Sequence, residues 1–86
     1  MQKILLLEDD TTLGGGIRLA LQSPTVQITL CRTLAQARGA VADNRYDLLI
    51  LDINLPDGIG LELLEQVRKT SRVPVILLTA NDLELD

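Results

Sequence analysis

The apolar residues of this chain gather in short runs, and between the runs they recur every three or four positions. Four runs are predicted strands, over residues 4–7, 26–30, 48–51 and 75–78. Three of them are unbroken and apolar, which is typical of strands in a parallel sheet that is covered on both faces. The run 26–30 alternates apolar and polar residues, so we expect an edge strand with one wetter face.

Each stretch between two runs predicts a helix, because its apolar residues fall on one helical face. The predicted stripes are Leu13, Ile17 and Leu21 with Ala20 beside them; Leu34, Ala37 and Val41; and Leu61, Leu64 and Val67. Asp10, Thr11 or Thr12 can cap the first helix, and Thr33 can cap the second. This alternation of strands and helices predicts an α/β fold, a doubly wound parallel sheet with right-handed crossovers. Asn81 and Asp82 resemble the cap of a further helix.

Composition excludes several classes of chemistry. The 86 residues, 47% hydrophobic and 23% charged, form one small globular domain or part of one. With no histidine and a single cysteine, Cys31, the chain cannot build a zinc finger, a Cys-His pair or a Ser-His-Asp triad. The one aromatic residue, Tyr46, leaves almost no stacking platform for bases or sugars.

Charge and hydropathy limit the partners. The net charge of −4 and the pI near 4.6 argue against this segment gripping a nucleic-acid backbone. The N-terminus carries no visible signal peptide, and no apolar segment approaches the roughly 20 residues that span a bilayer. We therefore expect a cytoplasmic protein with no membrane partner.

The polar residues of interest follow directly after the predicted strands. Glu8 and Asp9 end the first strand, Asp52 ends the third and Thr79 ends the fourth. Because the carboxyl ends of parallel strands meet at one edge, these side chains are expected to converge there. Carboxylates so close repel each other unless a cation shares the site, and hard oxygen ligands suit Mg²⁺. The plainer alternative is that these acids are solvated helix caps.

A carboxylate at the end of an apolar strand can act as a nucleophile. Asp52 is expected to be rigid and partly desolvated, and Mg²⁺ would offset the charge of an incoming phosphoryl group. An aspartyl phosphate would result, with the Thr79 hydroxyl bonded to a phosphate oxygen. A phosphatase of the haloacid dehalogenase type is the rival hypothesis, but it would need an Asp where this chain has Asn54.

The glycine run 14–16 does not predict a nucleotide-binding loop. It matches neither G-x-G-x-x-G nor G-x-x-x-x-G-K-[ST], and the acidic residues 8–10 just before it would repel an anion. These glycines are read as tolerated in a helix or as allowing close contact with a partner.

With these motifs the chain closely resembles the receiver domain of two-component response regulators, and most of all the OmpR-type transcriptional regulators. The motifs are residues 4–10 (ILLLEDD), 46–52 (YDLLILD), 55–58 (LPDG) with Gly60, and 74–80 (PVILLTA). The resemblance spans essentially all 86 residues and implies a flavodoxin-like sheet with strand order 2-1-3-4.

The resemblance also implies the site. Asp52 would accept a phosphoryl group from a sensor histidine kinase, and Asp9 would bind Mg²⁺ most directly. Glu8 would act beside Asp9, through water, and Asn54 would offer its backbone carbonyl. Thr79 would be the switch hydroxyl. The chain would be no enzyme beyond this self-catalysed transfer.

Two neighbouring acids are given structural roles instead. Asp10 is interpreted as the start of a helix. Asp57, in the turn 55–58 that aims Asp52, is interpreted as structural.

Residues 1–86 match only part of such a domain. A receiver continues through a fourth helix, a fifth strand ending in a Lys, and a fifth helix, whereas the only lysines here are Lys3 and Lys69. We therefore expect a partial receiver domain, seven elements plus the start of a fourth helix, that belongs to a longer protein. DNA would be contacted only through a C-terminal effector domain absent from this chain.

The missing part has expected consequences. Strand 75–78 would be an uncovered apolar edge, which invites a homodimer or a domain-swapped dimer. Loss of the Lys keeps open the alternative of a phosphorylation-independent pseudo-receiver that acts as a protein-interaction module.

Overall fold

The strands and helices predicted before residue 79 are all present in the computed structural model, which describes residues 1–78. Thr79 and the helix cap expected at Asn81 and Asp82 lie outside the described residues. The elements are β1 (Gln2–Leu7), α1 (Thr11–Leu21), β2 (Val26–Cys31), α2 (Leu34–Asp43), β3 (Leu48–Asp52), β4 (Asn54–Leu55), β5 (Gly58–Ile59), α3 (Gly60–Arg68) and β6 (Val75–Leu78).

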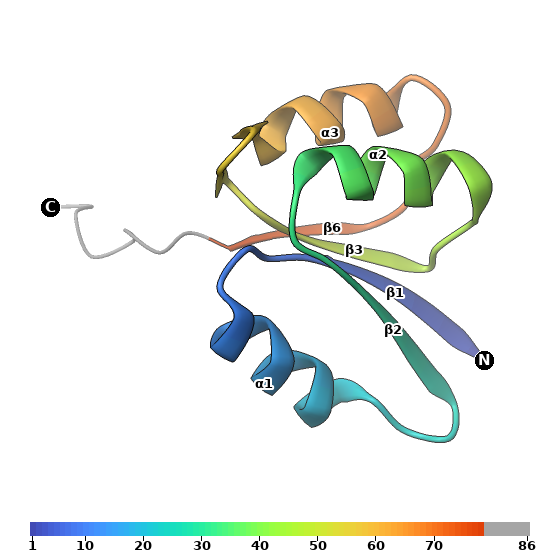
Figure 1. Cartoon of the computed structure of the whole chain (residues 1–86). Helices are drawn as coiled ribbons and strands as arrows, with labels where there is room; N and C mark the ends of the chain where they lie inside the picture. Colours follow the sequence, from blue (N-terminus) through green and yellow to red (C-terminus); the bar gives the residue numbers. More distant parts are fainter. Residues whose placement is uncertain (79–86) are drawn as a thin grey trace, which may run out of the picture.

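Four of these strands form one parallel sheet in the order β2-β1-β3-β6. This is the predicted order 2-1-3-4, since β6 is the fourth of the long strands. Helices α2 and α3 cover one face of the sheet and α1 covers the other (Figure 1), so the doubly wound α/β fold is confirmed. The alternating strand β2 lies at an edge, also as predicted. Within residues 1–78, β6 forms the other edge and pairs only with β3.

The two faces of the sheet build two separate cores. Alternate residues of a strand point to opposite faces, so Leu5 and Leu7 pack under α2 and α3 while Ile4 and Leu6 pack toward α1. The core under α2 and α3 is the larger. Its buried members are Leu5, Leu7, Cys31, Leu34, Ala37, Leu49, Leu51, Leu63 and Val67.

The stripe predicted for the first helix is wrong in part. Ile17 packs against the smaller core, but Leu13 is 49% exposed, and Ala20 and Leu21 are exposed as well. The buried residue of α1 is Gly14. Within the described residues α1 is the only helix on this face (Figure 1), so a narrow strip of it touches the sheet and the flanks of the stripe stay open.

The stripe predicted for the third helix is rotated. Leu61 is 42% exposed, whereas Leu63 and Val67 are buried and Leu64 is half-buried. The helix begins at the buried Gly60, and the next residue lies about 100° round the axis, which turns Leu61 away from the sheet. The stripe predicted for α2 is confirmed, with Val41 packed against the core at its far end.

The predicted helix starts are confirmed. The carboxylate of Asp10 accepts the backbone N–H of Leu13 at 3.0 Å, and the hydroxyl of Thr33 accepts that of Gln36 at 3.1 Å. Both side chains satisfy N–H groups that have no partner inside the helix. None of the helices in residues 1–78 is long and apolar enough to cross a membrane.

Between Asp52 and α3 the chain makes a small hairpin that the sequence did not predict. Strands β4 and β5 are antiparallel, with Asn54 opposite Ile59 and Leu55 opposite Gly58. The predicted turn 55–58 is therefore the tip of a hairpin that leads from the end of β3 into α3.

Candidate metal centre at the acidic edge of the sheet

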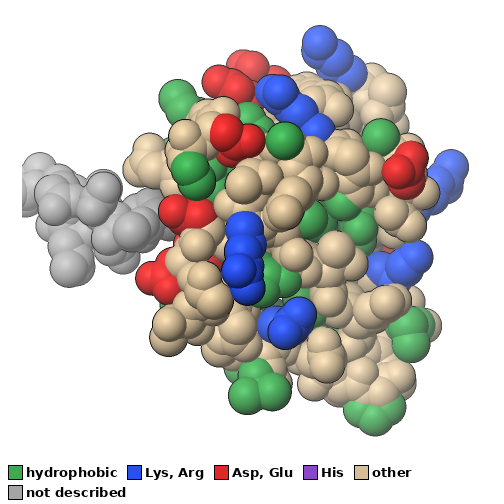
Figure 2. Space-filling model, viewed as in Figure 1, with side chains coloured by type: hydrophobic (Ala, Val, Ile, Leu, Met, Phe, Trp, Pro, Cys, Tyr) green, Lys and Arg blue, Asp and Glu red, His purple; other side chains and the backbone are tan. Residues whose placement is uncertain are grey.

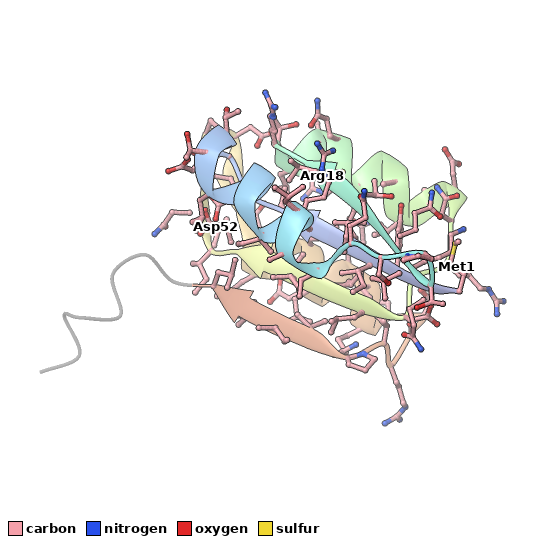
Figure 3. All side chains as sticks on the ribbon, turned by 90° about the horizontal axis from the view of Figure 1, so that it is seen from below. Met1, Arg18 and Asp52 are labelled. Carbon is pink, nitrogen blue, oxygen red and sulfur yellow. The ribbon has the colours of Figure 1, made fainter. Side chains whose placement is uncertain are left out.

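Three carboxylates meet at the carboxyl edge of the sheet. Glu8 and Asp9 follow β1, and Asp52 ends the neighbouring strand β3, so residues 43 positions or more apart in the chain become neighbours. One carboxylate oxygen from each residue lies within 4.8 Å of the other two. Figure 3 shows Asp52 at the end of the sheet opposite Met1, beside the first turn of α1. The convergence expected for these three residues is present in the structure.

Glu8 is held in place by its backbone and its side chain. Its N–H donates to the carbonyl of Cys31 at 2.9 Å, which extends the β1–β2 pairing by one residue. Its carboxylate accepts the N–H of Asp10 at 3.0 Å. A Cβ on Gly14 would lie 3.5 Å from the Glu8 side chain and 3.1 Å from Leu30, so the first glycine of the run allows α1 to pack closely over Glu8.

Asp52 is fixed by the start of α3. A Cβ on Gly60 would collide with the backbone carbonyl of Asp52, so only glycine permits this approach. The N–H of Gly60 also donates to the carbonyl of Ile53 at 2.7 Å, and the N–H of Ile53 donates to Leu78 at 3.3 Å. The backbone at Asp52 and just after it is therefore anchored.

The electrostatics of the cluster favour a bound cation. Glu8 is 4% exposed and Asp52 is 8% exposed. Burial is the main cause that raises the pKa of Glu8 from 4.5 to about 7, and the charge of Asp52 adds to it against the hydrogen bond from Asp10. Burial and the nearby Asp9 also raise the pKa of Asp52. Glu8 and Asp52 are thus held where their charge is poorly compensated.

The donor set fits Mg²⁺. Within residues 1–78 the one ion pair joins Arg38 to Glu62, and no basic side chain is paired with the three clustered carboxylates. Figure 2 shows acidic side chains at the left edge, where the strands of Figure 1 end, and further ones at the top and the right, while Lys and Arg lie over the middle, the top and the right. Carboxylate oxygens without a basic partner are the hard ligands that Mg²⁺ takes together with water.

The remaining predicted site residues are placed differently. Asn54 lies in β4, two residues beyond Asp52, with its side chain exposed, which is compatible with a ligand role through the backbone alone. Thr79 lies outside the described residues. Lys3 is the second residue of β1 and Lys69 caps the C-terminal end of α3, so both lie toward the opposite end of the sheet.

The structure adds a contact that sequence reasoning missed. The sequence predicts a structural role for Asp57, and its carboxylate accepts the backbone N–H groups of Leu34 at 2.8 Å and Ala35 at 3.1 Å. The bond from Leu34 is the main cause that lowers the pKa of Asp57. The partners lie more than 20 residues earlier in the chain, so no local pattern could have identified them.

The fold and the acidic edge together define an α/β domain with a candidate divalent-cation site at the carboxyl ends of its strands. The chain belongs to the response regulator receiver domain family, whose family model matches residues 4–85. This match confirms the resemblance noted in the sequence. Receiver domains of response regulators are signalling modules.

Individual relatives agree with this assignment. The chain is 36% identical over 86 residues to the KDP operon transcriptional regulatory protein KdpE of Escherichia coli. The alignment covers all of this chain but only 38% of that protein. Among solved structures, the non-phosphorylated HemR receiver domain of Leptospira biflexa superposes with a TM-score of 0.84 at 36% identity, over 93% of this chain and 65% of that one. The response regulator TrrA of Thermotoga maritima, solved in complex with Mg²⁺-BeF, gives 0.85 at 30% identity, over 99% and 77%.

Proposed function

We propose that this receiver domain accepts a phosphoryl group on Asp52 from a sensor histidine kinase, with Mg²⁺ as the cofactor. The proposal is carried by one observation, the convergence of Glu8, Asp9 and Asp52 with no basic partner among the described residues. The family and the relative solved with Mg²⁺-BeF support it.

The chemistry assigned to the chain is a transfer to a carboxylate. An Asp52 oxygen attacks phosphorus and forms an O–P bond, while the N–P bond of the kinase phosphohistidine breaks and its electron pair returns to the imidazole nitrogen. Bound Mg²⁺ supplies charge compensation and alignment for the phosphoryl oxygens. The acceptor stays oriented because β3 and Gly60 fix the backbone of Asp52.

The other predicted residues complete the proposal. Asp9 is proposed as the direct carboxylate ligand, Glu8 as its neighbour acting through water, and the backbone carbonyl of Asn54 as a further ligand. Thr79 is proposed as the hydroxyl that bonds the phosphoryl group. The transfer is self-catalysed, and its product is a signalling state of the domain.

The output is proposed to be control of transcription. KdpE and other relatives are transcriptional regulators, and the chain spans about 35–38% of their length. We propose that DNA is contacted by a separate effector domain, because this segment carries a net charge of −4.

The test is the intact mass of the full chain before and after incubation with Mg²⁺ and acetyl phosphate. We expect a gain of one phosphoryl group that requires Mg²⁺ and is lost in Asp52→Ala. The matched control is Asp43→Asn, which alters an exposed carboxylate at the end of α2 and should label as the wild type does. Labelling that persists in Asp52→Ala, or that ignores removal of Mg²⁺ by a chelator, would contradict the proposal.

A further inference from the structure

A single carboxylate ties the hairpin after Asp52 to the start of α2. One oxygen of Asp57 accepts the N–H of Leu34 and the other accepts the N–H of Ala35. These N–H groups open a helix and have no partner inside it. Asp57 thus joins the hairpin tip to an element that lies more than 20 residues earlier in the chain.

The hairpin is short enough to carry a displacement from its tip to its base. Its base is closed by the bond from Gly60 to Ile53, and the next pair, Asn54 with Ile59, follows directly. A strand of two residues spans only about 7 Å. We therefore expect a shift of the tip at Asp57 to move the backbone of Asn54 as well.

The tip also packs closely against α2. A Cβ on Gly58 would lie 2.7 Å from the Leu34 side chain, and Gly58 has a φ of +155°, which disfavours any side chain there. Leu34 is itself buried in the larger core. The hairpin therefore rests on a rigid platform, and the two hydrogen bonds of Asp57 hold it there.

We infer that Asp57 is a positioning residue for the cation site, because it clamps the hairpin onto α2 and so fixes the backbone carbonyl of Asn54. The inference rests on the proposed function, in which that carbonyl is a ligand. Asp57 acts through the backbone and is not a ligand itself. Its own charge is compensated by the two N–H groups and by the positive end of the α2 dipole.

Thr33 provides a matched control. Its hydroxyl caps the same helix by accepting the N–H of Gln36 at 3.1 Å, so its partner belongs to α2 and not to the hairpin. Loss of either Thr33 or Asp57 weakens the start of α2. Of these two losses, only that of Asp57 also releases the hairpin.

The first test is calorimetric titration of the full chain with Mg²⁺, alongside urea unfolding. We expect Asp57→Ala to raise the Kd for Mg²⁺ about tenfold, as is usual when support behind a ligand is removed. Thr33→Ala should stay within about twofold of the wild type. Asp57→Asn keeps one acceptor oxygen and should lie between them. Equal weakening by Thr33→Ala and Asp57→Ala would reduce Asp57 to an ordinary helix cap and overturn the inference.

A second test needs no variant, so it holds even if Asp57→Ala does not fold. Mg²⁺ should slow amide hydrogen exchange at Leu34 and Ala35 more than at Gln36, because coupling between two sites is reciprocal. Equal slowing at all three amides would indicate general stabilisation and would overturn the inference.

The two proposals fail in different ways. If the wild type binds no Mg²⁺, the proposed function falls and the positioning role falls with it. If the wild type binds Mg²⁺ and is labelled on Asp52, but Asp57→Ala binds as tightly as the wild type, only the positioning role is wrong.

Discussion

Two acidic regions lie near the same edge of the sheet, and the pKa values of their carboxyl groups are shifted in opposite directions. In the cluster of Glu8, Asp9 and Asp52, burial and mutual repulsion raise the pKa of Glu8 and of Asp52. At the hairpin tip, two backbone N–H groups lower the pKa of the exposed Asp57. The difference is the source of compensation: backbone N–H groups satisfy Asp57, whereas no basic side chain of residues 1–78 pairs with the cluster.

The comparison distinguishes carboxylates that can bind a cation from one that holds two segments of the chain together. A carboxylate whose oxygens already accept backbone N–H groups gains little from a cation, while a cluster of three carboxylates, two of them buried, gains a great deal. Asp57 therefore holds structure in place, and the cluster is where chemistry is expected. The experiments below test this division, from the largest effect to the smallest.

The largest expected effect is on phosphoryl labelling. Asp52→Asn should lower the rate of labelling by acetyl phosphate by at least about 100-fold, since it removes the nucleophile. Asp57→Asn leaves the nucleophile in place and should slow labelling by less than about tenfold. The rates are measured by intact mass at saturating Mg²⁺. Comparable losses in the two variants would erase the distinction between the regions.

The next effect is on stability between pH 5 and pH 8. Because the folded-state pKa of Glu8 is about 7 against an ordinary 4.5, the folded protein binds more protons than the unfolded chain in this window. The free energy of unfolding without Mg²⁺ should therefore fall by about 2 kcal/mol as the pH rises through 7. Urea unfolding at several pH values measures it.

Variants and Mg²⁺ assign that slope to the cluster. Glu8→Gln should flatten it, and the control Glu65→Gln, at an exposed position of α3, should leave it unchanged. Saturating Mg²⁺ should reverse the trend, since the cation binds the ionised carboxylates. A stability that rises between pH 5 and pH 8 without Mg²⁺ would show that the cluster is already compensated.

The contribution of the Asp57 carboxylate to stability should depend on pH in the opposite direction, and at lower pH. The pKa of Asp57 is lowered from 3.8, so its contribution to stability is present above that value and is lost as the pH falls below it. We expect Asp57→Asn to lose less stability than the wild type between pH 5 and pH 3, a difference smaller than that from Glu8. The free energy of unfolding of both proteins is measured with urea at several pH values. An equal loss in the two proteins between pH 5 and pH 3 would contradict the role given to the Asp57 carboxylate.

The smallest effect concerns Arg38, which pairs with Glu62 at 3.4 Å on the exposed side of α2 and α3. Exposed ion pairs contribute about 0–1 kcal/mol, so Arg38→Gln should barely move the urea midpoint. The pKa of Asp57 should stay low in this variant, because the Leu34 N–H is its main cause and Arg38 a minor one. The pKa is measured by NMR titration. An ordinary pKa of Asp57 in Arg38→Gln would show that Arg38 causes the shift instead.

Local patterns were sufficient for the four long strands, the three helices and the acidic edge. Apolar runs identified the four long strands, side chains with short-range partners identified the caps at Asp10 and Thr33, and the polar residues after the strands identified Glu8, Asp9 and Asp52. These features are set by period, by turn chemistry and by the rule that parallel strands end at one edge. Each depends on neighbours in the chain or on the topology alone.

Only the tertiary structure decided which apolar residues are buried on the helices. The spacing of leucines in α3 suited Leu61 as well as Leu63, and the close approach of Gly60 to Asp52 selected Leu63. In α1 the coverage of the sheet, and not the stripe, left Leu13 exposed. Helical rotation is set by contacts between elements, and a periodic pattern does not contain them.

The role of Asp57 shows the same limit. The sequence determined by itself that a turn follows Asp52, because its proline, aspartate and glycine favour one. The partners of the Asp57 carboxylate, Leu34 and Ala35, depend on how α2 and the hairpin pack on the sheet. A hydrogen bond across more than 20 residues is decided by that packing, since either partner alone is an ordinary turn residue or an ordinary helix start.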